Sequence, residues 1–139
     1  MSTSIIRQLA QHSAVRFCLV GLVNTAVGLS LIYASKYGLG LGDVPANLIG
    51  YIIGLMVSFM LNSRYTFRYD GPVWPAALRF VITFAIAYTA NIVTVLALRD
   101  AAGVNADLAH ALAVAPYTIT FYLLSRFMVF AGGAKRPAA

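Results

Sequence analysis

Four long stretches without a charged residue divide the chain. They cover residues 17–35, 44–63, 80–98 and 108–125. A helix that crosses the hydrocarbon core of a bilayer needs about 20 consecutive, mostly apolar residues, and each stretch is close to that length. The pattern therefore predicts an all-α membrane protein with four transmembrane helices, forming a single transmembrane domain over residues 1–139.

The composition agrees with a membrane protein. Hydrophobic residues make up 60% of the 139 residues and charged residues only 10%, which leaves too little polar surface to cover a soluble globule. The formal net charge is +6, but the basic residues form no continuous stripe of the kind that binds nucleic acid. We therefore expect anionic lipids, and no nucleic acid, as partners of these charges.

One segment occurs twice in altered form. Residues 59–67 (FMLNSRYTF) resemble residues 121–129 (FYLLSRFMV) at an offset of about 62, and Arg16-Phe17 resembles Arg79-Phe80. The repetition predicts two units, over about 15–67 and 78–130, with Leu124 in the place of Asn62. Because each unit holds two helices, both copies enter the membrane from the same side, so these are parallel repeats.

The basic residues also predict an orientation. One side of the membrane would receive Arg7, Arg16, Arg64, Arg68, Arg79, Arg126, Lys135 and Arg136, and the other only Lys36 and Arg99. Since cytoplasmic loops are enriched in Lys and Arg, both termini are predicted to be cytoplasmic.

Small and polar residues predict which helix faces pack together. Three- and four-residue spacings place the following residues on two inward faces: Phe17, Gly21, Asn24 and Gly28 in the first helix, and Asn47, Gly50, Gly54, Ser58 and Asn62 in the second. At the helix starts, Asp43 and Pro45 suit the second helix, and Asp107 is expected to cap the fourth. The linker between the second and third helices is expected to span 64–79.

Three polar side chains fall at membrane depth: Asn24, Thr25 and Asn91. An unpaired amide or hydroxyl is costly in hydrocarbon, so each must find a partner inside the protein. Two explanations stay open, namely hydrogen bonds between helices and the binding of polar lipid headgroups.

Four arginines at helix ends carry the clearest chemistry: Arg16, Arg64, Arg79 and Arg126. If the fold gathers them around the pseudo-twofold axis that relates the two repeats, their guanidinium groups form a site for a lipid phosphate or pyrophosphate. The alternative is that they only snorkel to the interface and set the topology, which requires no ligand.

The residues expected of an enzyme are missing from this sequence. No Asp or Glu lies in a predicted span, no Ser-His-Asp or Cys-His arrangement occurs, and Cys18 is the single cysteine. We therefore expect no catalysis, no metal site and no cofactor.

The segments RFCLVGLVNT (16–25) and SFMLNSRYTF (58–67), with Arg79-Phe80, resemble the GtrA-like family over nearly the whole chain. This resemblance implies a small multi-pass protein of the bacterial inner membrane that translocates a polyprenyl-phosphate-linked monosaccharide for cell-surface polysaccharide modification. The matching positions, which the resemblance implies bind substrate, are Arg16, Asn24, Thr25, Asn62, Arg64 and Arg79. Asn91 and Arg126 join them through the depth and repeat arguments.

Two other functions fit the same sequence. Some relatives in the family are viewed as membrane anchors that recruit a glycosyltransferase. A small-cation exporter fits the size and helix count, but the predicted spans lack the carboxylate that proton exchange normally needs. For translocation, four helices enclose little volume, so a homodimer or larger homo-oligomer is expected to build the path.

Overall fold

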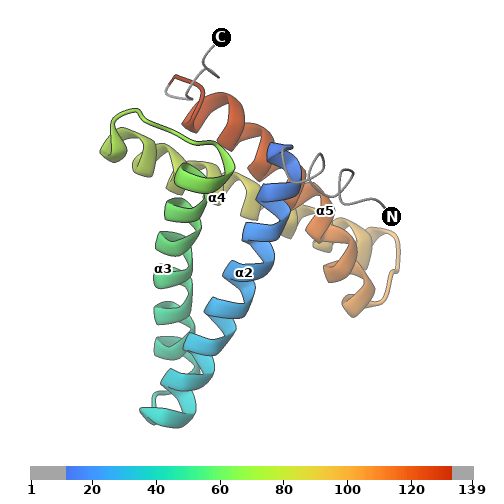
Figure 1. Ribbon diagram of the computed structural model, residues 1–139. Helices are drawn as coiled ribbons and strands as arrows, with labels where there is room; N and C mark the ends of the chain where they lie inside the picture. Colours follow the sequence, from blue (N-terminus) through green and yellow to red (C-terminus); the bar gives the residue numbers. More distant parts are fainter. Residues whose placement is uncertain (1–11, 133–139) are drawn as a thin grey trace, which may run out of the picture. The chain divides into compact units, whose positions relative to one another are not determined.

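The computed structural model describes residues 12–132, and the described residues fold into two helical hairpins. The first hairpin holds α2 (Ser13–Tyr33) and α3 (Asp43–Leu61), and the second holds α4 (Val73–Leu96) and α5 (Ala106–Leu124). Figure 1 shows the two helices of the first hairpin running side by side. The predictions for Arg7, Lys135 and Arg136 lie outside the described residues.

Each α-helix continues into a π-helical turn. These turns are η1 (Ala34–Gly38), η2 (Asn62–Thr66), η3 (Ala97–Ala101) and η4 (Ser125–Val129). With the turns included, four helical segments are long and apolar enough to cross a membrane: Ser13–Gly38, Asp43–Thr66, Val73–Ala101 and Ala106–Val129. The prediction of four helices of spanning length is confirmed, while the cytoplasmic termini stay a prediction.

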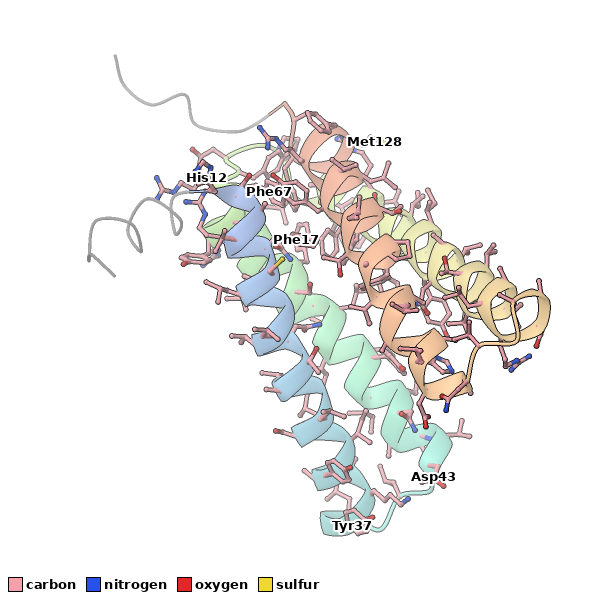
Figure 2. The ribbon with its side chains drawn as sticks, turned by 90° about the vertical axis from the view of Figure 1, so that its right-hand side faces the viewer. His12, Phe17, Tyr37, Asp43, Phe67 and Met128 are labelled. Atoms are coloured by element: carbon pink, nitrogen blue, oxygen red, sulfur yellow. The ribbon has the colours of Figure 1, made fainter. Side chains whose placement is uncertain are left out.

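Each hairpin has a turn end and an open end. The turn end joins the two helices through a short loop, and the open end holds the start of the first helix and the end of the second. In the first hairpin, Tyr37 and Asp43 lie at the turn end and Phe17 and Phe67 at the open end (Figure 2).

Matching features of the two hairpins lie 63 residues apart. Asp43 and Ala106 begin the second helices, and Asn62 and Ser125 begin the last π-helical turns. This register retains the match of Arg16 with Arg79, but it corrects the offset of 62. Ser125, not Leu124, stands in the place of Asn62, and Arg126 corresponds to Ser63 instead of Arg64. The identical Ser-Arg dipeptides are thus out of structural register by one residue.

The inward face of α3 repeats every four residues. Its buried positions are Ala46, Gly50, Gly54 and Ser58, and Asn62 and Thr66 extend the row into η2. Asn47 was wrongly placed on this face, because strict four-residue spacing selects Ala46. Asn47 is exposed and its amide donates to the Asp43 carbonyl at 2.8 Å.

The α2 face is also corrected at one position. Val20 is buried, whereas Gly21 is exposed with open space around it. Gly50 has the opposite environment, because a Cβ added there would overlap the Ile32 side chain and lie 3.1 Å from the Gly28 carbonyl oxygen. The missing side chain at Gly50 therefore allows α2 and α3 to approach closely inside the first hairpin.

Two further predictions at helix starts were wrong. The fourth helix is capped by Asn105, whose side-chain oxygen accepts from the Leu108 backbone N–H at 3.2 Å, while Asp107 lies in the first turn. The α4 helix begins at Val73, so the linker is shorter than 64–79 and Arg79 lies within the helix. A long arginine side chain near a helix end can reach the interface, and a charge-free criterion therefore starts the third span too late.

Three helix ends close with the same wide turn. Backbone N–H groups reach back six residues, from Leu41 to Ser35 (3.1 Å), from Tyr69 to Ser63 (2.7 Å) and from Val104 to Leu98 (2.9 Å). The residue before each donor has a left-handed backbone, and two of the three are glycines, Gly40 and Gly103, both at φ 66°. The third is Arg68 at φ 49°. This conformation costs an L-residue with a side chain about 1–2 kcal/mol.

Candidate functional site

Arg16 holds the open end of the first hairpin together. It lies in the first turns of α2, and its Nη2 donates to the carbonyl oxygen of Thr66 in η2 at 2.9 Å. Its guanidinium carbon also lies 5.9 Å from the centroid of the Tyr65 ring. Because the last carbonyls of a helix lack partners within it, this arginine satisfies one of them across the hairpin.

Arg79 makes the corresponding contact in the second hairpin. Its Nη1 donates to the carbonyl oxygen of Met128 at 3.2 Å, and its Nε donates to the Pro75 carbonyl at 3.2 Å. Arg16 and Arg79 therefore share one structural role, namely joining the start of the first helix to the end of the second. Arg79 is exposed, whereas Arg16 is half-buried and its Nε is buried without a hydrogen-bond partner.

Arg64 and Arg126 differ in their surroundings. Arg126 is exposed, donates from Nη1 to the Tyr122 hydroxyl at 2.8 Å, and lies 5.4 Å from the centroid of the Phe127 ring. Arg64 is also exposed, but within residues 12–132 it has no hydrogen bond or ion pair. Of these four arginines, Arg64 is thus the one with its hydrogen-bond donors fully available.

Asn62 lies at the centre of a polar row inside the first hairpin. Its side chain is 2% exposed, and its Nδ2 donates to the Ser58 carbonyl at 3.0 Å and to the Ser58 hydroxyl at 3.3 Å. Its Oδ1 is buried without a partner, as is the Oγ1 of Thr66 one turn further along. Leaving such an atom unpaired costs about 1–3 kcal/mol.

Asn24 brings a third unpaired oxygen to this row from the opposite helix. Its Oδ1 is buried without a partner, and a Cβ built on Gly54 would lie 3.5 Å from it. The amide of Asn24 thus packs against α3 at Gly54. We call Asn24, Ser58, Asn62 and Thr66 the polar seam of the first hairpin.

Thr25 and Asn91 do not belong to the polar seam. The Thr25 hydroxyl is exposed and donates to the Gly21 carbonyl of its own helix at 3.0 Å. In the second hairpin, Asn91 Nδ2 donates across to the Ala113 carbonyl at 3.0 Å. Of the two explanations for buried amides, Asn91 thus shows the interhelical hydrogen bond.

Charges are paired at the turn ends. In the first hairpin, Lys36 Nζ lies 2.5 Å from Asp43 Oδ1. In the second, the Arg99 guanidinium donates two hydrogen bonds, of 2.6 and 3.0 Å, to the Asp100 carboxylate. Basic side chains at the open ends instead contact carbonyls, aromatic rings and a hydroxyl. The available positive charge of the described chain is therefore concentrated at the open ends, where a phosphate would be attracted.

Three residues that contribute to these surroundings were not predicted as site residues: Ser58, Thr66 and Arg68. Extending the four-residue row from Gly54 through Ser58 and Asn62 would have reached Thr66. Arg68 carries no comparable sequence signal, because its left-handed backbone depends on the turn that follows α3. In the range 12–132, no group of three His, Cys, Asp or Glu residues is placed to hold a metal ion.

Comparison with known proteins connects this geometry to a family. The sequence profile described as "GtrA/DPMS, transmembrane domain" matches residues 16–130, which include both hairpins and all eight predicted site residues. The chain belongs to the GtrA/DPMS family. It is a multi-pass membrane protein, as the four apolar helices also require.

A curated relative in this family adds a functional comparison. Bactoprenol-linked glucose translocase from Shigella flexneri is 33% identical over 63 residues, which cover 45% of this chain and 51% of the relative. The match thus spans about half the length of that translocase. It links the GtrA/DPMS family to the movement of a lipid-linked sugar, and the same activity in this chain is a matter for proposal.

Proposed function

We propose that this protein translocates a polyprenyl-phosphate-linked monosaccharide across the bacterial inner membrane. The single observation that carries the proposal is the polar seam, in which the oxygens of Asn24, Asn62 and Thr66 are buried without donors. Such atoms are costly unless a hydroxyl group or water pairs with them during function. The hydroxyl groups of a sugar supply the missing donors.

The two ends of the substrate require different chemistry from the protein. Guanidinium groups bind phosphate oxygens through charge-assisted hydrogen bonds, so the arginines of the open ends, Arg16, Arg64, Arg79 and Arg126, would receive the lipid phosphate. The polar seam begins at the same open end of the first hairpin, since the backbone carbonyl of Thr66 accepts a hydrogen bond from Arg16. A headgroup held at Arg64 would therefore have its sugar beside Thr66 and Asn62.

The role of each predicted substrate-binding residue follows from its surroundings. Asn24 and Asn62 would pair with sugar hydroxyls, Arg64 would carry most of the phosphate binding, and Arg16 would hold the open end in shape. Thr25 and Asn91, whose polar groups already have partners, would contribute little to binding.

Leaflet exchange tests this function. The purified protein is reconstituted into vesicles that contain a fluorescent polyprenyl-phosphate glucose, and a membrane-impermeant reagent reports how fast the inner-leaflet lipid appears outside. We expect exchange faster than in protein-free vesicles and dependent on Asn62. Exchange no faster than in protein-free vesicles would contradict the proposal. Co-purification of a glycosyltransferase whose activity survives loss of Arg16 and Arg64 would then favour recruitment instead.

A further inference from the structure

Arg68 has a left-handed backbone conformation, which is unfavourable for a residue with a side chain. It is the only non-glycine residue with positive φ among residues 12–132, and the equivalent turns use Gly40 and Gly103. All three positions precede a backbone N–H that closes the same six-residue turn. The turn itself therefore gives no reason for an arginine, and a role for its side chain is the natural physical explanation.

The surroundings of Arg68 leave its guanidinium group free. The side chain is exposed, and in the part of the chain that the structure describes it makes no hydrogen bond or ion pair. Arg64 is in the same condition four residues earlier, in η2. Two cations without an ion pair in the described chain thus lie four residues apart at the end of α3, and a bound anion would reduce the repulsion between them.

The depth of these residues indicates what kind of anion. The apolar segment Asp43–Thr66 ends two residues before Arg68, and Tyr65 beside it is 47% exposed. Tyrosine and arginine at the end of an apolar helix are typical of the membrane–water interface, where lipid phosphates lie. The second hairpin has no such pair, because Phe127 and Ala131 stand at the positions equivalent to Arg64 and Arg68.

We infer that Arg64 and Arg68 form a lipid phosphate site at the open end of the first hairpin. Arg68 lies in the turn that follows η2, four residues after Arg64, and in this site both guanidinium groups bind one phosphate. Arg16 has a structural role at this end, since its Nη2 donates to the Thr66 carbonyl and its side chain is half-buried, whereas Arg64 and Arg68 are exposed. Naming the lipid as a polyprenyl phosphate rests on the proposed translocation, whereas the phosphate chemistry does not.

Substitution of Arg68 by glycine separates binding from folding. R68G removes the guanidinium group and relieves the backbone, so we expect the melting temperature to stay equal or rise. The affinity for polyprenyl phosphate in nanodiscs, measured by fluorescence quenching, should fall about fivefold or more, as expected for loss of a charge-assisted hydrogen bond. A purely structural role for Arg68 predicts the opposite, namely a lower melting temperature with unchanged affinity, and would overturn the inference.

Matched variants test whether the site is local. R99Q also removes one arginine charge, but at a turn end, so the affinity of this variant for polyprenyl phosphate should stay within about twofold of the wild type. R64Q should weaken binding as R68G does. The double variant R64Q/R68G should lose less than the product of the two single losses, because both arginines contact one phosphate. If R68G does not fold, R68N provides the test, since asparagine also tolerates a left-handed backbone.

Two lipids distinguish the source of the phosphate. An R68G loss restricted to polyprenyl phosphate supports a substrate site, and an equal loss for phosphatidylglycerol supports a general lipid phosphate site. Unchanged binding of both lipids would overturn the inference. Binding is measured without translocation, so wild-type vesicles without leaflet exchange would contradict the proposed function while leaving the Arg64–Arg68 site intact.

Discussion

The two hairpins have the same order of helices and turns, but different side chains occupy their equivalent positions. Midway along the helices, Gly28 faces Gly50 in the first hairpin, and Asn91 bonds to Ala113 at the equivalent positions of the second. Closer to the open end, Ser58 and Asn62 of the first hairpin correspond to Phe121 and Ser125. The two helices therefore contact each other through close backbone approach in the first hairpin and through a side-chain hydrogen bond in the second.

The difference continues into the interior. Near the open end the second hairpin is packed with aromatic rings, and Phe121 lies 5.0 Å from Phe80, 5.7 Å from Tyr117 and 6.1 Å from Phe84 between ring centroids. Aromatic contacts of this kind stabilise a packed interior. The first hairpin instead has three buried oxygens without a partner, those of Asn24, Asn62 and Thr66, whereas the described part of the second hairpin has one, the Ser125 hydroxyl. The comparison teaches that the second hairpin is built for stability and the first leaves polar groups available.

The largest expected effect is on translocation by Asn62→Leu. It removes the central amide of the polar seam, and leaflet exchange should fall about tenfold or more, equivalent to ~1.4 kcal/mol in the barrier. The variant loses two hydrogen bonds to Ser58 together with an unpaired buried oxygen, and leucine is of similar size, so the melting temperature should change little. Ser125→Ala at the equivalent position should leave exchange within about twofold. Equal losses in both variants would remove the distinction between the hairpins.

The next largest effect is on stability, from Gly50→Ala. The added Cβ meets Ile32 and the Gly28 carbonyl, so α2 and α3 must separate, at a cost of about 1–3 kcal/mol. Gly21→Ala is the matched control, because Gly21 has open space and alanine favours helix. Unfolding in detergent by a denaturant series measures both. A Gly50→Ala protein as stable as Gly21→Ala would show that close approach does not hold the first hairpin.

A smaller effect distinguishes the two kinds of buried amide. Asn91→Ala removes a hydrogen bond between helices and should cost about 0.5–1.5 kcal/mol. Asn24→Ala removes an amide oxygen that has no partner, so stability should change less or increase. The same unfolding measurement compares the two. Greater destabilisation by Asn24→Ala than by Asn91→Ala would indicate that the Asn24 oxygen does have a partner in the membrane.

The smallest effect concerns the helix caps. Asn105→Ala removes the side-chain cap of α5 and should cost about 0.5–1 kcal/mol, whereas Asp107→Ala should cost less because Asp107 accepts no capping bond. Hydrogen exchange of the backbone amide of Leu108 reports the change directly. Faster exchange in Asp107→Ala than in Asn105→Ala would restore Asp107 as the cap.

The sequence predicted the spans and several inward residues, because both depend on local patterns. The three- and four-residue spacings identify Gly50, Gly54, Ser58 and Asn62 as inward residues, and these four are buried. Asn47 was misplaced since three- and four-residue spacings overlap at a helix start, and only packing against α2 separates them. The predicted offset of 62 was wrong because the Ser-Arg dipeptide occurs in both hairpins, but one residue out of structural register.

What the sequence determined by itself is the number, length and chemistry of the helices, since hydrocarbon thickness and residue hydrophobicity act on each segment separately. The tertiary structure decided which polar groups have partners. Arg16 reaches Thr66, and Asn24 faces Gly54, only because a turn at Gly40 sets the register of α3 against α2. A shift of one residue there would rotate the face of α3 by about 100° relative to α2 and separate these residues.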